Sequence, residues 1–145
     1  MNTASTPSHR VSGSCLCGTV TLTVPLTSYQ VAACHCRMCR VWGGSPLFAV
    51  EPAGPIELEG EDAITVFASS EWAERAFCRH CGTHLFYRLK DGQHYAIPAG
   101  LVDQGQDWHF DHQIFIDQKP AWYHFGNQTQ DMTGQEVFDA FGGDG

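Results

Sequence analysis

Seven cysteines, gathered into three short clusters, constrain this 145-residue chain more than any other feature of its sequence. Because seven is odd, the thiols cannot all pair in disulfides within the chain. Scattered cysteines would fit an interpretation as small buried apolar side chains, but spacings of one and two residues fit it poorly. A Cys-x-x-Cys turn points two thiolates at one tetrahedral ion, so the clusters predict metal binding. The clusters are Cys15-Leu16-Cys17, Cys34-His35-Cys36-Arg37-Met38-Cys39 and Cys78-Arg79-His80-Cys81.

Zinc is the metal we expect at thiolate-rich sites, because it needs no redox chemistry and accepts four sulfurs. An iron–sulfur cluster is an alternative on ligand type alone. Seven thiols divide naturally into a closed structural site of four and an open site of three. A histidine is an alternative fourth ligand, although a side chain between two ligands, such as His35 or His80, usually points elsewhere. The count alone does not say which cluster stands by itself.

Composition sets the class of protein. With 43% apolar and 17% charged residues, the chain can bury a core, and its length predicts a single domain over residues 1–145, with a core of 11–123 and loose ends. A net charge of −8 repels phosphate backbones and argues against nucleic acid as a partner. No apolar run approaches the roughly 20 residues of a membrane span. Met1–Arg10 lacks the apolar stretch of a secretory signal, so we expect a cytoplasmic protein with reduced thiols.

Hydrophobic periodicity predicts many short strands interrupted by glycine and proline, and therefore a mainly β protein with a small all-β fold. A helical turn is expected at Cys36–Trp42, ended by Gly43-Gly44, and a short tail helix at Gln135–Phe141. A hairpin is expected around the turn between Cys78 and Cys81. The predicted strands cover residues 20–25, 47–50, 56–59, 64–68, 85–89, 94–97, 114–116 and 121–123, together with Phe77.

Three blocks of the sequence resemble the signature blocks of the glutathione-dependent formaldehyde-activating enzyme family, which also includes centromere protein V. The resemblance covers residues 11–123 and matches the family in the order of the blocks and in the cysteine count. The C-terminal stretch from Lys119 to Tyr123 is also similar. The blocks are Gly13-Ser14-Cys15-Leu16-Cys17-Gly18, Cys34-His35-Cys36-Arg37-Met38-Cys39-Arg40 and Phe77-Cys78-Arg79-His80-Cys81-Gly82-Thr83-His84-Leu85.

The resemblance implies a fold shared with B-type methionine sulfoxide reductases, and it implies which thiols bind which ion. Two zinc ions per chain would bind, one at a four-thiolate structural site and one at an open three-thiolate site. The first set is Cys15, Cys17, Cys78 and Cys81, and the second is Cys34, Cys36 and Cys39. The implied reaction of a carbon–sulfur lyase joins glutathione and formaldehyde into S-hydroxymethylglutathione.

Within the open site we expect Cys36 to be the exchangeable, catalytic thiolate. Arg37 and Arg40 flank it and are candidates for receiving the carboxylates of glutathione, because guanidinium pairs with carboxylate through two parallel hydrogen bonds. Ordinary solvated charge is the alternative interpretation of these two cations. The partners expected are therefore glutathione or a related thiol and a small aldehyde.

Two other functions compete with the lyase. A zinc-stabilised binding module without catalysis is one, and a fourth protein ligand at the second site would favour it. A methionine sulfoxide reductase is the other, but it needs a nucleophilic cysteine outside the metal sites, and the seven ligands leave none.

Overall fold

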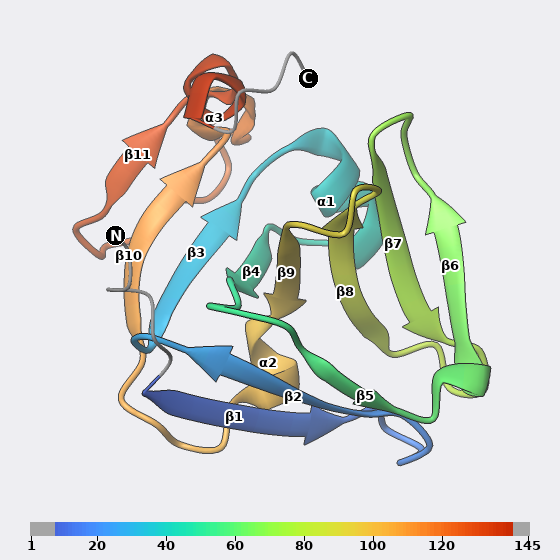
Figure 1. Ribbon diagram of the computed structural model, residues 1–145. Helices are drawn as coiled ribbons and strands as arrows, with labels where there is room; N and C mark the ends of the chain where they lie inside the picture. The colour runs from blue at the N-terminus through green and yellow to red at the C-terminus, as the bar shows by residue number, and fades with distance from the viewer. Residues whose placement is uncertain (1–7, 141–145) are drawn as a thin grey trace. The chain divides into compact units, whose positions relative to one another are not determined.

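The computed structural model describes residues 8–140, and this part of the chain is mainly β (Figure 1). Within these residues short strands dominate and the helices have at most seven residues, as the sequence predicts. The fold class is thereby confirmed, while the similarity to B-type methionine sulfoxide reductases stays a prediction. The expected loose ends, 1–7 and 141–145, lie outside the described residues. No helix of residues 8–140 combines the length and apolar character needed to cross a bilayer.

Contacts between residues divide the chain into two compact units, each assembled from two separate stretches of sequence. In the described chain the first unit comprises residues 8–29 and 50–107, and the second comprises 30–49 and 108–140. Neither unit is a continuous stretch that could be cut out of the chain. The assignment of residues 1–145 to a single domain stays a proposal.

The first unit contains a three-stranded antiparallel sheet in the order β1-β2-β5. Its strands are β1 (His9–Ser14), β2 (Thr21–Leu26) and β5 (Glu57–Glu59). Alternation along β2 buries Leu22, Val24 and Leu26, which is the pattern of a strand with one apolar face. The strand continues through Pro25 rather than ending there, because β5 pairs only with Thr21–Thr23 and requires no amide donor from the proline.

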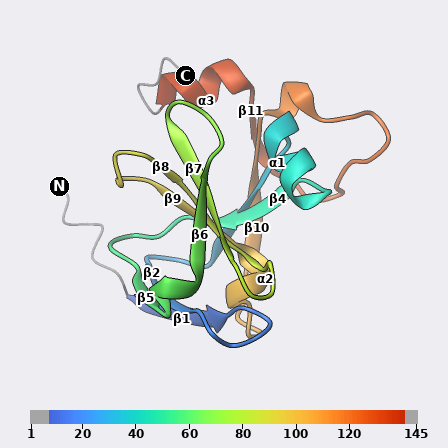
Figure 2. The ribbon, with the colours of Figure 1, turned by 90° about the vertical axis from the view of Figure 1, so that its right-hand side faces the viewer.

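A second antiparallel sheet of the first unit is a meander of four consecutive strands, which lie side by side in both ribbon views (Figures 1 and 2). The strands are β6 (Ile64–Ala68), β7 (Ala73–Cys78), β8 (His84–Leu89) and β9 (Tyr95–Pro98), followed by the short helix α2 (Ala99–Val102). Leu85, Phe86 and Ile97 are fully buried. The hairpin of β7 and β8 carries the Cys-x-x-Cys turn at its tip, as predicted.

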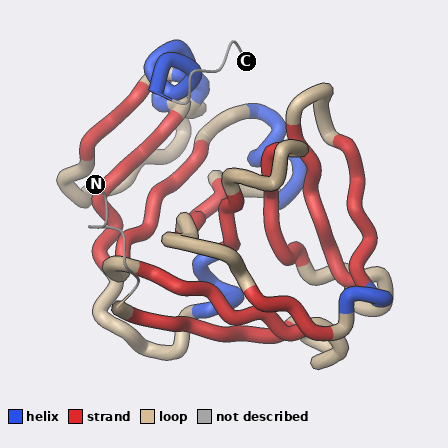
Figure 3. The backbone as a smooth tube through the Cα atoms, viewed as in Figure 1, coloured by secondary structure: helices blue, strands red, loops and turns tan. Residues whose placement is uncertain are grey.

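The second unit contains a mixed sheet in the order β11-β10-β3-β4. Strand β10 is parallel to both of its neighbours, whereas β4 is antiparallel to β3. Figure 3 shows how short the helices are beside these strands. The elements are β3 (Gln30–Cys34), α1 (Arg37–Gly43), β4 (Leu47–Val50), β10 (His109–Ile114), β11 (Gln130–Met132) and α3 (Gly134–Ala140).

The expected strands 114–116 and 121–123 are wrong. Strand β10 ends at Ile114, since Phe115 has a left-handed backbone (φ 55°) and Ile116–Gln118 form a 3-10 turn. Residues 121–123 are irregular. Short apolar runs do not by themselves identify a strand, and Trp122 in the second stretch is 78% exposed rather than buried in a sheet. Of the predicted tail helix Gln135–Phe141, the part up to Ala140 is confirmed and Phe141 lies outside the described residues.

Candidate metal centres

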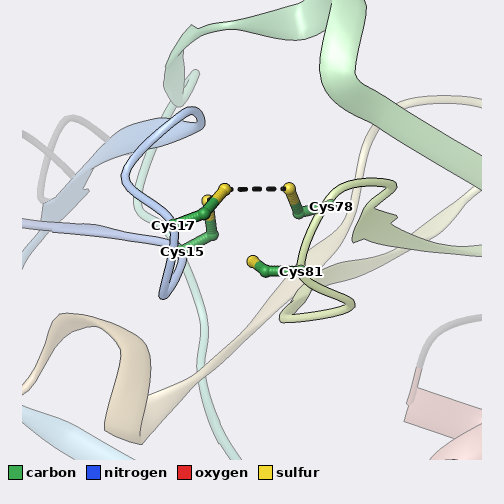
Figure 4. A group of neighbouring side chains, drawn as sticks. All are labelled: Cys15, Cys17, Cys78 and Cys81. Atoms are coloured by element: carbon green, nitrogen blue, oxygen red, sulfur yellow. Dashed lines mark hydrogen bonds between the residues drawn. The ribbon is translucent and has the colours of Figure 1, made fainter.

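Four thiols of the first unit meet between two turns that are far apart in sequence. Cys15 and Cys17 come from the turn after β1, and Cys78 and Cys81 come from the tip of the β7–β8 hairpin. Figure 4 shows the four side chains directed toward one another. The Sγ atoms of Cys15 and Cys17 are 3.5 Å apart, and those of Cys17 and Cys78 are 3.7 Å apart. The family resemblance implies this set, and the structure brings all four thiols together.

Both turns depend on a glycine in the left-handed region. Gly18 (φ 82°) donates its amide to the carbonyl of Cys15 at 2.9 Å, and Gly82 (φ 79°) donates to that of Cys78 at 2.7 Å. A side chain at either position would strain the backbone. The turns therefore hold each pair of thiols on one side of its loop.

Thr83 connects the two turns. Its hydroxyl accepts a hydrogen bond from the amide of Leu16 at 3.1 Å and lies 3.2 Å from the thiol of Cys81. Hydrogen bonds from the side chain and backbone of Thr83 lower the pKa of Cys81 to about 5. A thiolate is thus favoured at this position near neutral pH, which is the form that binds a metal ion.

The four-thiol group fits a tetrahedral metal ion. Its Sγ atoms all lie within 4.8 Å of one another, and a zinc–sulfur distance of about 2.3 Å in tetrahedral geometry requires sulfurs about 3.8 Å apart. Burial raises the pKa of Cys15, but hydrogen bonds from the Val20 amide and from Cys17 outweigh it and the net shift is downward. Burial is also the main reason that the pKa of Cys78 is raised. The cluster can hold one metal ion.

Three further thiols form a second group in the second unit. Cys34 is the last residue of β3, Cys36 is the N-cap of α1, and Cys39 lies in that helix. Their Sγ atoms also lie within 4.8 Å of one another. The amide of Cys39 donates to the sulfur of Cys36 at 3.3 Å, and Gly44 (φ 81°) ends the helix where the sequence predicts. In the part of the chain that the structure describes, this group consists of these three thiols.

The three thiols differ in exposure. Cys34 and Cys39 are 9% and 5% exposed, whereas Cys36 is half-buried and the most accessible. Hydrogen bonds with Cys36 and Cys39, together with burial, raise the pKa of Cys34 well above its usual value. Without a metal ion, this thiol therefore keeps its proton, and binding of an ion has to displace it.

His35, between two of these thiols, is not available as a ligand. It is fully buried, and both ring nitrogens have partners, Tyr123 Oη at Nδ1 and Gln113 Oε1 at Nε2, each at 2.8 Å. Burial is the main reason that its pKa is lowered. These contacts occupy both ring nitrogens, so the imidazole has no free nitrogen for a metal ion at the neighbouring thiols. His80 is exposed and lies outside the four-thiol group.

The two arginines near the three-thiol group have different surroundings. Arg37 is exposed, and its backbone amide donates to Gln118 Oε1 at 2.9 Å. Arg40 is half-buried, and its Nε donates to the carbonyl of His35 at 2.9 Å. Arg40 thus supports the thiol-bearing loop with part of its guanidinium, while Arg37 extends toward solvent.

An open cavity of about 610 Å³ also lies in the second unit. Gln113, Lys119, Phe125, Thr129 and Asp131 are among the residues that line it. Gln113 lines the cavity and also forms a hydrogen bond with His35, which lies between Cys34 and Cys36. The cavity wall is therefore linked directly to the loop that carries these two thiols. Sequence reasoning missed Gln113 and Thr83, since a lone glutamine or threonine has no spacing pattern that marks it.

The fold and the two thiol groups define a small, mainly β protein with two candidate metal centres of unequal ligand number. Residues 10–118 match the sequence profile of the glutathione-dependent formaldehyde-activating enzyme family. An uncharacterized lyase of Schizosaccharomyces pombe is 36% identical over 126 residues, which cover 86% of this chain and 92% of that protein. The chain belongs to this family, as the three cysteine blocks predict.

A solved structure of a Rhodobacter sphaeroides protein is similar in fold. The TM-score is 0.56 with 22% sequence identity, over 66% of this chain and 91% of that one. At this level of identity the likeness concerns the fold alone.

Proposed function

We propose that the protein is a zinc-dependent carbon–sulfur lyase that interconverts S-hydroxymethylglutathione with glutathione and formaldehyde, or acts on a related adduct of a thiol and a small aldehyde. Family membership and the lyase name of the yeast relative support the reaction class. We place the protein in the cytoplasm, where glutathione and reduced thiols occur together.

The observation that carries the proposal is the unequal ligand number of the two thiol groups. Four thiols complete a tetrahedral site, whereas Cys34, Cys36 and Cys39 supply only three ligands, and the nearby His35 is committed to other partners. A three-ligand site is typical of metal centres that do chemistry. A binding module would be expected to close both sites with protein ligands.

The reaction requires a thiolate and a carbonyl carbon in contact. In the forward direction the sulfur–carbon bond forms, the carbonyl π bond breaks, and the proton of the thiol ends on the new hydroxyl, with no change in oxidation state. A zinc ion at the three-thiol group would lower the pKa of an incoming thiol and polarise a carbonyl oxygen.

The protein's own residues have distinct roles in this proposal. Cys34 and Cys39 are the buried ligands, and Cys36 is the accessible thiolate that exchanges with the incoming thiol. Arg37, which is exposed, receives a carboxylate of glutathione. Arg40 has a mixed role, because its Nε already donates to the His35 carbonyl and only the rest of its guanidinium remains for substrate.

Metal content and ligand binding together test the proposal. Elemental analysis of the full chain is expected to find two zinc ions, and calorimetric titration is expected to show saturable binding of glutathione. Cys36→Ala should keep the fold and abolish activity, whereas Cys78→Ala should damage the fold. One zinc ion per chain with no glutathione binding would remove the lyase and leave the binding module.

A further inference from the structure

Five side chains behind the three-thiol group form a continuous chain of hydrogen bonds. Nδ1 of His35 lies 2.8 Å from Tyr123 Oη, and Nε2 lies 2.8 Å from Gln113 Oε1. Nε2 of Gln113 donates to Thr129 Oγ1 at 2.9 Å, and Thr129 donates to Asp131 Oδ1 at 2.6 Å. All five residues belong to the second unit, so the chain is complete within it.

The direction of the bonds in this chain follows from the amide of Gln113. Its nitrogen can only donate, so the Thr129 hydroxyl accepts from it and donates its own proton to Asp131. The carbonyl oxygen of Gln113 then accepts from His35, whose Nε2 carries the proton. Nδ1 is left as an acceptor for the hydroxyl of Tyr123. The imidazole is thereby held as one neutral tautomer in one orientation.

The backbone of His35 is held as firmly as its side chain. Its amide donates to the carbonyl of Ile114 at 3.1 Å, and its carbonyl accepts from Arg40 Nε at 2.9 Å. Lys119 secures the loop that carries Tyr123, since its Nζ donates to the Tyr123 carbonyl at 2.5 Å. His35 therefore has a partner at each of its four polar atoms, while its two neighbours in sequence are the thiols of the open group.

We propose that His35 is a positioning residue for the three-thiol site, and that Tyr123 and Gln113 act through it to hold Cys34 and Cys36 at the spacing a metal ion requires. The proposal rests on the proposed function in one respect, namely that the three-thiol group binds a metal ion. Outer hydrogen-bond partners that orient ligands typically change metal affinity by about 10- to 100-fold. His35 has other partners at both ring nitrogens, so it orients the neighbouring ligands without being one.

Binding of Co²⁺ to the metal-free full chain tests this proposal, because thiolate-to-cobalt absorbance reports on both sites of one molecule. The part of this absorbance that is lost in Cys36→Ala is assigned to the three-thiol site. The absorbance that remains comes from the four-thiol site and is an internal reference. Tyr123→Phe keeps the ring and removes only the hydroxyl, so it is the main variant. Gln113→Leu removes the partner of Nε2. His35→Leu loses both ring contacts, whereas His35→Gln keeps a donor directed at Gln113.

Thr133→Ala is the matched control. The Thr133 hydroxyl accepts from the amide of Glu136 at the start of α3, within the same unit but outside the hydrogen-bond chain. Its loss should lower the melting temperature, as loss of a helix cap does, without reaching the thiol-bearing loop. A variant that acts only through stability should resemble this control.

We expect Tyr123→Phe and Gln113→Leu to weaken Co²⁺ binding at the three-thiol site by about tenfold or more, with no change at the four-thiol site or in Thr133→Ala. His35→Gln should recover part of the affinity lost in His35→Leu. A Tyr123→Phe protein that binds Co²⁺ as tightly as wild type, or an equal loss in Thr133→Ala, would overturn the positioning role and leave the proposed function intact. Wild-type protein that binds Co²⁺ only at the four-thiol site would overturn both.

Discussion

Removing one ligand from the four-thiol group should destabilise the fold far more than removing one from the three-thiol group. A metal ion at the first group links positions 61 residues apart in sequence, Cys17 and Cys78. By the chain-entropy relation for cross-links, closing a loop of this length stabilises the folded state by about 4 kcal/mol. For a chain of 145 residues this corresponds to about 13 °C in melting temperature.

The ligands of the second group span only six residues of sequence, from Cys34 to Cys39, so a metal ion there restricts the unfolded chain little. Cys36→Ala also removes the N-cap contact to the amide of Cys39. Loss of an N-cap costs about 1 kcal/mol, which is about 3 °C for a protein of this size. The two variants should therefore differ about fourfold in their effect on stability.

Thermal unfolding followed by circular dichroism measures this difference in the zinc-loaded full chain. Repeating the melts after chelation separates the cross-link from local packing, because without zinc the large gap between Cys78→Ala and wild type should nearly vanish. The reasoning fails if zinc-loaded Cys78→Ala melts within the shift seen for Cys36→Ala. It fails equally if the gap persists unchanged in metal-free protein, since packing alone would then account for it.

Three further predictions concern a glycine turn of the first unit, the contacts of Thr83 at the four-thiol group, and the metal. Gly60→Ala should be clearly more destabilising than Gly92→Ala. Both glycines have positive φ, which costs about 1–2 kcal/mol for alanine, but a Cβ at position 60 would also lie 2.1 Å from a backbone oxygen, whereas position 92 is open. Equal urea midpoints for the two variants would refute the added clash. Thr83→Val removes the hydroxyl that contacts Cys81 and the Leu16 amide, so the free energy of unfolding should fall by about 1–3 kcal/mol. An unchanged urea midpoint would contradict this. Chelation of wild type should lower its melting temperature by about 13 °C, and an unchanged melt after verified metal removal would refute the structural role of the four-thiol site.

Cysteine spacing was sufficient to predict metal-binding clusters and their division into four and three ligands, because the side chains within each cluster are positioned by a turn only a few residues long. Gly18 and Gly82 have the positive φ that such turns require. The sequence alone could not say that the turn at Cys15 meets the hairpin at Cys78, since that depends on how β1, β2, β7 and β8 fold. The family resemblance supplied this pairing, and the structure brings the thiols together.

The two hydrogen-bond partners of His35, Gln113 and Tyr123, could not be predicted from the sequence for a different reason. Gln113 lies 78 residues from His35, in a strand whose sequence is rich in polar residues and lacks alternation. Tyr123 lies in an irregular segment that apolar character wrongly marked as a strand. Contacts of this kind arise from tertiary packing, and short-range pattern has no bearing on them.

The exchange rate between formaldehyde and S-hydroxymethylglutathione tests the central claim most directly. Carbon-13 exchange spectroscopy on labelled formaldehyde with glutathione measures this rate at equilibrium, with and without protein. Zinc-loaded wild type should accelerate the exchange without moving the equilibrium, and Cys36→Ala, still folded, should return it to the rate of the protein-free mixture. An exchange rate in the presence of folded, fully zinc-loaded wild type equal to that of the protein-free mixture would contradict the claim that the three-thiol site performs this reaction.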